Sequence, residues 1–162
     1  MRNFIVLILL LFVSLIARSQ NPRGSVIVTL GAEREILPDS NDTLREYYED
    51  RNLKKLKFWR GDSLIIKELR STGLLKEILR FPKTDLKNKS LTKFNDKGII
   101  ILQASYVNGI VDGAFSKYHR DGKLKEQGTY KMMRKNGVWK YYDQKGMLQR
   151  TETYQNGSMT RD

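Results

Sequence analysis

The sequence predicts an all-β protein: an elongated, single-layer antiparallel sheet of repeated β-hairpins, preceded by a signal peptide. Three observations predict this fold class. Aromatic residues and glycines recur at intervals of 24 over the second half of the 162-residue chain. Glycine follows Asn, Asp or Lys at regular corners, and apolar and polar side chains alternate between these corners. A fixed period of this length is typical of a repeat architecture in which each unit is one supersecondary element.

The first element is the N-terminal segment, residues 1–19, which has the pattern of a secretory signal peptide. Arg2 precedes the apolar run Phe4–Ala17, and Ala17-Arg18-Ser19 supplies the small residues of a cleavage site. An uncleaved transmembrane anchor is the alternative, but the apolar run is shorter than the roughly 20 residues that cross a bilayer. We therefore expect export, with the mature protein periplasmic or secreted.

Residues 20–43 are expected to form an N-terminal cap followed by a loop. The β-branched run Ser25–Leu30 is typical of a strand, and Pro38–Asp42 is rich in turn-forming residues. The strand would close one end of the sheet, and the loop would join it to the repeats.

Residues 44–162 form the predicted hairpin array, with degenerate copies before residue 94. The repeat-defining aromatic residues and turn glycines are Phe94, Tyr106, Tyr118, Tyr130, Trp139, Tyr142, Tyr154, Gly98, Gly113, Gly122, Gly137 and Gly146. Upstream, Gly73 keeps the glycine spacing with a slip of one residue, and Asn52 stands where later copies have glycine. In the middle copy, Met132-Met133 replaces Asn-Gly.

The glycine corners predict tight turns, because Asn, Asp and Gly adopt the positive φ of short hairpin loops. The corners include Asn108-Gly109, Asp112-Gly113, Asp121-Gly122, Asn136-Gly137 and Asn156-Gly157. Between corners, alternation places Leu124, Glu126, Gly128 and Tyr130 on one face, opposite Lys123, Lys125, Gln127 and Thr129. We expect one face of the sheet to be aromatic and aliphatic, with rings packed between neighbouring hairpins, and the other to be basic and polar.

One stretch, Leu64–Leu79, also permits a helix. Its apolar spacing partly fits an amphipathic helix, but Gly73 interrupts it and the repeat register accounts for it as strands. We therefore expect two strands there.

The repeat has a recognisable order: aromatic, Asp-Gly or Asn-Gly, Lys-Leu, aromatic, then a second turn and an aromatic. One copy reads Tyr118, Asp121, Gly122, Lys123, Leu124, Tyr130, Asn136, Gly137, Trp139 and Tyr142. This order resembles the MORN-repeat family in its bacterial variant form, which includes antitoxin-like repeat proteins. The resemblance implies a hairpin array that serves as a scaffold or binding surface, and other members of the family are associated with acidic phospholipids. An export signal fits poorly with neutralising a cytoplasmic toxin.

The composition argues against an enzyme and against a bound metal or cofactor. The chain has no cysteine and a single histidine, His119, so thiolate chemistry is excluded and a histidine-rich metal site is disfavoured. Asp121 and Asp143 stand beside corners, where Asp caps backbone groups, and we expect Glu126 and Glu152 to occupy matching places on successive strands, although their spacing of 26 exceeds the period by two. We expect the acids to serve the fold, and His119 to be a solvated surface residue.

The chain is basic, with a formal net charge of +12 that becomes about +10 without Arg2 and Arg18. The excess is spread over both halves, which indicates either a solvated surface or contact with an acidic envelope component. Nucleic acid is a poor partner for an exported chain, and any membrane contact is expected to be peripheral. The candidate binding face is Lys123, Lys125, Lys131, Lys135 and Lys140.

The sequence therefore favours an exported, non-catalytic module that binds another protein or acts as a scaffold in the cell envelope. Two alternatives stay open: a peripheral binder of anionic lipid or polysaccharide through the basic face, and an antitoxin-like protein.

Overall fold

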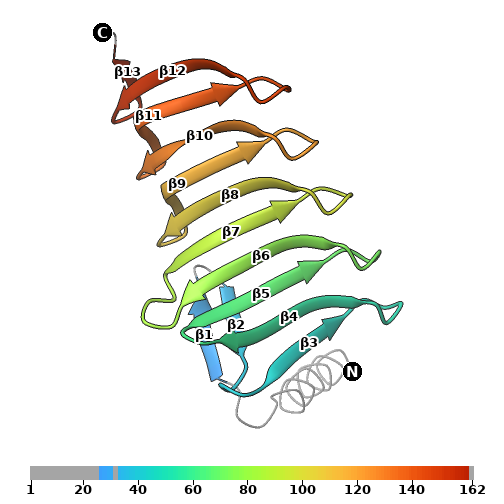
Figure 1. The fold of residues 1–162 in the computed structure, drawn as a ribbon. Helices are drawn as coiled ribbons and strands as arrows, with labels where there is room; N and C mark the ends of the chain where they lie inside the picture. Colours follow the sequence, from blue (N-terminus) through green and yellow to red (C-terminus); the bar gives the residue numbers. More distant parts are fainter. Residues whose placement is uncertain (1–25, 31–32, 161–162) are drawn as a thin grey trace, which may run out of the picture.

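The computed structural model describes residues 26–30 and 33–160, and every helix or strand assigned within these ranges is a β-strand. A two-stranded hairpin, β1 (Val26–Leu30) and β2 (Glu33–Leu37), precedes an 11-stranded sheet. The strands of the sheet are β3 (Thr43–Tyr47), β4 (Leu53–Arg60), β5 (Ser63–Leu69), β6 (Leu75–Pro82), β7 (Asn88–Phe94), β8 (Ile100–Val107), β9 (Ile110–Tyr118), β10 (Leu124–Lys131), β11 (Arg134–Tyr142), β12 (Leu148–Gln155) and β13 (Ser158–Thr160). They pair antiparallel in chain order and stack into one elongated layer (Figure 1). The predicted fold class is confirmed.

The N-terminal predictions have mixed outcomes. The signal peptide, residues 1–19, lies outside the described residues. The predicted strand is present as β1, and Pro38–Asp42 is a loop. The prediction that this strand closes one end of the sheet is wrong, because β1 pairs with β2 in a separate hairpin and β3 is the edge strand. The sequence pattern does not predict β2, because the charged run Glu33–Glu35 hides the alternation of a strand. The helix that Leu64–Leu79 permits is absent, and this stretch forms β5 and the first part of β6, as expected.

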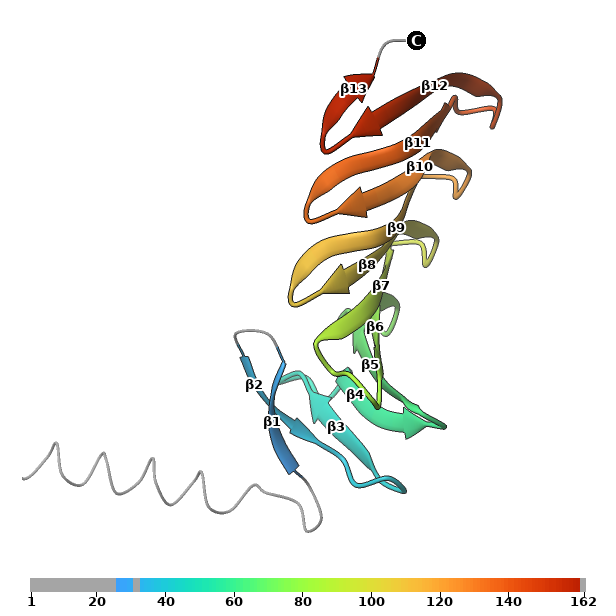
Figure 2. The same cartoon turned by 90° about the vertical axis from the view of Figure 1, so that its left-hand side faces the viewer.

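The β1–β2 hairpin lies on one face of the sheet, beside its N-terminal strands (Figure 2). Leu37 at its end is buried with Leu64, Ile66 and Phe81, which together form a small apolar core. The Trp59 Nε1 group donates a hydrogen bond of 3.1 Å to the Pro38 carbonyl and fixes the connection to the sheet. Because this core lies under the hairpin, the first third of the sheet is two layers thick.

Five equivalent turns lie at one end of the sheet, where odd-numbered strands lead into even-numbered ones. In each, the amide of the first residue donates to the carbonyl of the fifth, and the amide of the fourth donates back to the first. The turns are Tyr48–Asn52, Arg70–Leu74, Asn95–Ile99, His119–Lys123 and Asp143–Met147. Their fourth residue has positive φ; it is glycine in four turns and Arg51, with φ 67°, in the first. Arg51, and not Asn52 as predicted, therefore takes the place of the turn glycine.

Turns of two residues lie at the opposite end of the sheet. Positive φ at both central residues is typical of type I′ turns, and it occurs at Asn108-Gly109, Met132-Met133 and Asn156-Gly157. Two predicted corners are wrong: Gly113 and Gly137 lie inside β9 and β11, where the register shifts against β8 and β10. Their φ angles of 104° and 73° are typical of glycines at β-bulges, which explains why they follow the same period as true corners.

The hairpins are tied to one another by the side chains that begin four of the five-residue turns. Each side chain donates to a backbone carbonyl at the next turn along the sheet, either in the turn or in the last strand residue before it: Tyr48 to Leu69 at 2.7 Å, Arg70 to Phe94 at 3.0 Å, Asn95 to Arg120 at 3.0 Å, and His119 to Tyr142 at 3.0 Å. His119 bonds through Nε2, which carries the hydrogen because the carbonyl can only accept. The expectation that His119 is a solvated surface residue is therefore wrong; it is half-buried in this ladder of turns.

A second set of bulges lies beside the same turns and breaks the predicted alternation. The register slips by one residue in five hairpins, and the extra residues are Lys54, Lys76, Ile101, Lys125 and Gln149. As a result, Leu124 pairs with Tyr118 on one face, while Glu126 pairs with Lys117 on the other. The predicted grouping of Leu124 with Glu126 is wrong for this reason.

The two faces of the sheet are named here after one residue each. A row of paired residues defines the Trp139 face: Ile66, Leu79, Leu91, Ala104, Phe115, Gly128 and Trp139. The opposite surface is the Ser105 face, defined by Ile65, Arg80, Ser90, Ser105, Ala114 and Thr129. The predicted aromatic rows divide between the two faces, because Tyr118 and Tyr142 bond Gln103 and Gln127 on the Ser105 face.

Trp139 is the best-packed side chain of the C-terminal hairpins, with an exposed fraction of 0%. Its ring lies 5.0 Å from the Tyr130 ring and 5.7 Å from the Phe115 ring, and its Nε1 donates to the Thr129 carbonyl at 3.2 Å. It lies directly over Gly128, where an added Cβ would be 2.4 Å from the indole. The absence of a side chain at Gly128 therefore makes room for the ring.

We predict that Gly128→Ala destabilises the protein by about 1–3 kcal/mol, because the methyl group would push Trp139 out of its position. Thr129→Ala is the control, since this exposed neighbour offers only its backbone carbonyl to Trp139. Urea unfolding followed by tryptophan fluorescence measures both variants. Equal midpoints for the two variants would show that the close approach of Trp139 to Gly128 has no energetic importance.

Candidate binding groove on the Ser105 face

The Ser105 face carries small hydroxyl and amide side chains over its middle strands. One cross-strand row contains Thr92, Gln103, Ser116 and Gln127, and the parallel row contains Ser90, Ser105, Ala114 and Thr129. Within the described part of the chain, the hydroxyl groups of Ser90, Thr92, Ser105 and Ser116 make no hydrogen bond to other protein groups. These hydroxyls therefore remain available to a ligand.

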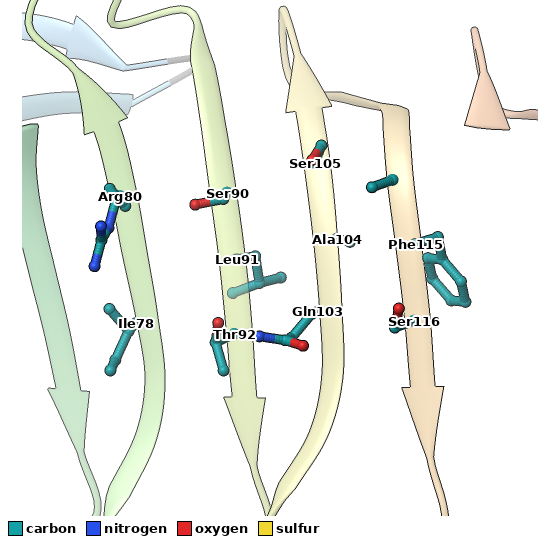
Figure 3. Close-up of a pocket in the computed structure, with 11 residues that line it drawn as sticks. Ile78, Arg80, Ser90, Leu91, Thr92, Gln103, Ala104, Ser105, Phe115 and Ser116 are labelled. Atoms are coloured by element: carbon teal, nitrogen blue, oxygen red, sulfur yellow. The ribbon is translucent and has the colours of Figure 1, made fainter. Parts of the chain in front are cut away.

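A shallow groove of about 410 Å³ runs over these residues from β6 to β9. Ile78 and Arg80 form one side and Ser116 the other, and the Gln103 side chain extends toward Thr92 between them (Figure 3). The ring of Phe115 points away from this surface (Figure 3), since it packs against Trp139 on the opposite face. The floor is consequently backbone and small polar groups, with no aromatic platform.

The groove continues into a second hollow of about 280 Å³ near the two-residue turns. Arg80, Ser90 and Ser105 line both hollows, so the two are contiguous. Asn88 lines the second hollow, and its Oδ1 atom is buried without a hydrogen-bond partner, while its Nδ2 donates to Asp85 at 2.8 Å. A buried acceptor of this kind costs free energy unless a donor reaches it. A ligand that brings an N–H or O–H group would satisfy it.

Charge is distributed unequally between the faces. Among the strand residues from 36 onward, five glutamates form ion pairs, and all five belong to the Trp139 face. The contacts are Glu46–Lys57, Glu68 with Lys55 and Lys76, Glu77–Lys93, Glu126–Lys117 and Glu152–Arg150. On the Ser105 face, Arg80 and Lys140 have no carboxylate within ion-pair distance in the described ranges. Arg80 is therefore the cation of the groove that can contact an anion; in the contiguous hollow, Asp112 lies at the lining and Lys89 contacts the Phe81 and Tyr106 rings.

The five lysines proposed as the binding face do not share one surface. Lys140 lies on the Ser105 face between Gln127 and Thr151. Lys123 is in a turn, bonded to the Gln144 carbonyl at 3.1 Å, and Lys125 is a bulge residue. Lys131 is exposed at the end of β10, beside the two-residue turn. The prediction of one lysine face is wrong, because the bulges and turns change the direction of these side chains.

Lys135 lies on the opposite side and is packed among aromatic rings. Its Nζ atom lies 4.4 Å from the centre of the Trp139 ring and 5.1 Å from the ring centres of Tyr141 and Tyr154. It also donates a hydrogen bond of 2.6 Å to the Tyr141 hydroxyl. Cation–π contacts of this kind stabilise the fold, so Lys135 is a structural residue of the Trp139 face.

Glu152 organises the other side of this cluster. It accepts hydrogen bonds from Arg150 at 2.8 Å and from the Tyr154 hydroxyl at 2.8 Å. The Arg150 guanidinium, helped by Tyr141 and Tyr154, lowers the pKa of Glu152 from 4.5 to about 2. Burial and the neighbouring carboxylate raise the pKa of Tyr141, so its hydroxyl stays protonated. The cluster holds the last hairpins together and has no substrate-sized opening of its own.

The described residues contain no group of three or more His, Cys, Asp or Glu side chains placed to hold a metal ion. Nor do they include a helix with the length and hydropathy of a membrane span. The features of the Ser105 groove are those of a binding surface: unpaired hydroxyls, an unsatisfied amide oxygen and an unpaired arginine.

The fold and this surface define a repeat protein built from stacked β-hairpins. Residues 111–132 and 135–156 each match the family described as MORN repeat variant. This part of the chain, from β9 to β12, consists of two adjacent repeats of that family, as the sequence predicts. The search of curated proteins gave no match.

Two solved structures resemble the chain at low identity. The crystal structure of TarM shares 15% identity with a TM-score of 0.40, over 76% of this chain and 22% of TarM. A mutant of S. aureus TarM in complex with fondaparinux, α-GlcNAc-glycerol and UDP shares 10% identity with a TM-score of 0.39, over 72% of this chain and 22% of that chain. This chain thus spans about a fifth of the length of either TarM chain.

We predict that acid destabilises the protein partly through Glu152. Its pKa is lower in the folded state, so the stability it contributes is present above about pH 4.5 and is lost as pH falls toward about 2. Glu152→Gln should therefore reduce the fall in melting temperature between pH 5 and pH 2.5, as measured by circular dichroism. Glu49→Gln, at an exposed turn residue, is the control and should leave the wild-type slope. Parallel slopes for wild type and Glu152→Gln would contradict the role of this carboxylate.

Proposed function

We propose that this protein is an exported, non-catalytic interaction module of the cell envelope, and that the groove of the Ser105 face binds an extended segment of another protein. Repeats of the MORN variant family are generally modules that contact proteins or membranes. The single observation that carries the proposal is the division between the faces. The Trp139 face uses its rings and glutamates in packing and ion pairs, whereas the middle of the Ser105 face presents unpaired polar groups.

The chemistry of the groove suits a peptide backbone. An extended peptide offers an N–H group for Asn88 Oδ1 and carbonyl groups for the serine hydroxyls, and a side-chain carboxylate would pair with Arg80. Small side chains on the floor allow close approach of the ligand backbone. The serine, threonine and glutamine side chains over β7 to β9 favour a peptide backbone as the ligand of the groove.

A second candidate function is the binding of anionic lipid or polysaccharide. The observation that favours it is that two separate cations of the Ser105 face, Arg80 and Lys140, have no carboxylate partner within the described ranges. Contacts of this type are exposed, so added salt would screen them over about 10 Å at 0.1 M ionic strength. The antitoxin-like role has no such feature in its support.

We predict that filling the groove abolishes partner binding. Thr92→Trp places a large ring in the groove, and Thr151→Trp is the matched control, since it lies in the same cross-strand row of the Ser105 face but outside the groove. The mature wild type and both variants would be used for affinity capture from the native cell envelope. A protein captured by wild type and Thr151→Trp, lost with Thr92→Trp and retained in about 0.5 M salt, is the expected result.

Equal capture by all three proteins would overturn the assignment of the groove. Capture of lipid or polysaccharide that is released by salt and weakened by Arg80→Gln and Lys140→Gln would favour the second candidate.

Export itself leads to a separate prediction. We expect cleavage after Ser19, so that the protein recovered from its own cells begins at Gln20, because the segment before it has the charged start, short apolar core and small residues of a signal. Intact mass spectrometry of the native protein measures this. A full-length mass, with the protein resistant to extraction from membranes by carbonate, would show an uncleaved anchor instead.

A further inference from the structure

A separate hollow of about 680 Å³ lies on the opposite surface of the sheet, the Trp139 face, at β7 to β9. Its apolar lining comes from Ile101, Leu102 and Phe115. This part of the face lies between two regions that are already occupied: the core with Leu37 from β2 toward the N-terminus, and the ring cluster around Trp139 toward the C-terminus. The hollow is thus the open stretch of an otherwise packed surface.

Cations surround this apolar floor. Lys93 and Lys117 are the direct cross-strand neighbours of Leu102 on either side. Arg120 stands at the rim and is paired there with Asp96 at 3.6 Å, so the two lysines are the cations that face Leu102. Each lysine has one carboxylate partner, Glu77 at 3.7 Å and Glu126 at 4.0 Å, and both partners lie on the sides away from Leu102. The two ammonium groups therefore flank the leucine with no acid between them.

The repeat shows what is missing at this position. Leu102 is 24 residues before Glu126 and 25 after Glu77, so both neighbouring hairpins have glutamate at the equivalent place. There each glutamate pairs with one lysine across the strands, Glu77 with Lys93 and Glu126 with Lys117, while its other cross-strand neighbours are Glu68 and Tyr141. At Leu102 alone of these three positions, two lysines face an apolar side chain. A carboxylate supplied from outside would lie between these two lysines, and apolar atoms attached to it would cover the floor.

We propose that this hollow binds a peptide segment of a partner protein that carries a large apolar side chain next to an acidic one, as a second site independent of the Ser105 groove. The apolar side chain packs on Leu102, Ile101 and Phe115, and the carboxylate lies between Lys93 and Lys117. A recessed hollow bounded by strand ends and turns fits an inserted side chain better than the flat surface of a bilayer. Charge complementarity and shape therefore point to a peptide instead of a lipid surface.

The test uses the mature protein with labelled Ile and Leu methyl groups and NMR titration of three synthetic peptides. Each is an extended Gly/Ser decapeptide with a central Phe-Glu, Phe-Gln or Ser-Glu pair. We expect the Phe-Glu peptide to shift the Leu102 and Ile101 methyl signals. The Phe-Gln peptide loses two exposed ion pairs and the Ser-Glu peptide loses the buried ring, so each should bind roughly tenfold more weakly. Equal affinity for Phe-Glu and Phe-Gln, or no shift with any peptide, would overturn the proposal.

Variants of the protein give the second arm. In Leu102→Glu the protein itself supplies the carboxylate, as the neighbouring hairpins do. This variant should bind the Phe-Glu peptide roughly tenfold or more weakly than wild type, and Leu102→Gln should lose less affinity for it. Lys140→Gln, on the other face, is the matched control and should bind as wild type. If Leu102→Glu fails to fold, the double variant Lys93→Gln/Lys117→Gln keeps the apolar floor and should also lose the preference for Glu over Gln. Unchanged binding by these variants would overturn the proposal.

Vesicles containing phosphatidylglycerol distinguish a lipid ligand. If they shift the Leu102 methyl signals and the Phe-Glu peptide does not, the hollow is a lipid site and the peptide proposal is wrong. The Thr92→Trp variant should bind the Phe-Glu peptide as wild type does, so failure of the Ser105 groove as a binding site leaves this result unaffected.

Discussion

The hydrogen-bonded ladder of turns is the interaction on which the rest of this structure depends. Beyond the strands covered by the β1–β2 hairpin, the sheet has no second layer to hold its strands, and one hairpin alone is marginal in water. Here the side chains of Tyr48, Arg70, Asn95 and His119 each reach a carbonyl at the following turn, so neighbouring hairpins are joined at one end in the same way. The residue types differ, but all four are donors of sufficient length. The repeat therefore keeps a hydrogen-bonding function at this position and not a residue identity.

The ladder fixes the spacing of the hairpins, and this spacing lets the two faces take different roles. On the Trp139 face, rings and ion pairs from adjacent hairpins come into register, as in the contact of Trp139 with Phe115 and the pairing of Glu126 with Lys117. These contacts use the strand carboxylates, so Arg80 and Lys140 on the Ser105 face have no acidic partner among the residues that the structure describes. Stability and binding capacity thus come from opposite surfaces of one layer.

Much of the fold could be predicted from the sequence, because a fixed period constrains every copy at once. The spacing of Gly98, Gly122 and Gly146 identifies the turns, since their positive φ is required in each hairpin. The period cannot distinguish a turn glycine from a bulge glycine, which is why Gly113 and Gly137 were misplaced. The five bulges next to the turns leave no residue signature, as Lys54, Ile101 and Gln149 have nothing in common.

The candidate groove was harder to predict for a related reason. Its members are Ser, Thr and Gln, which are ordinary residues of an exposed strand face, and only pairing across four strands brings Thr92, Gln103 and Ser116 together. The number of lysines in this region predicts a basic face, but the Lys135 side chain lies on the opposite face, where it packs on Trp139. The strand register decides which charged side chains share a surface. The repeat period does not show where a bulge shifts this register by one residue, so it cannot assign each lysine to a face.

Both candidate sites lie at β6 to β9, and the position has a structural cause. The N-terminal strands are covered on the Trp139 face by the core around Leu37, and the C-terminal strands fill the same face with aromatic rings. Between them the Trp139 face carries Leu102, where Glu126 stands one repeat later. On the opposite face, the small side chains of Ser90, Ser105 and Ala114 leave the groove. In a repeat protein, binding sites are therefore expected where a copy departs from its neighbours in side-chain volume or charge while the backbone remains the same.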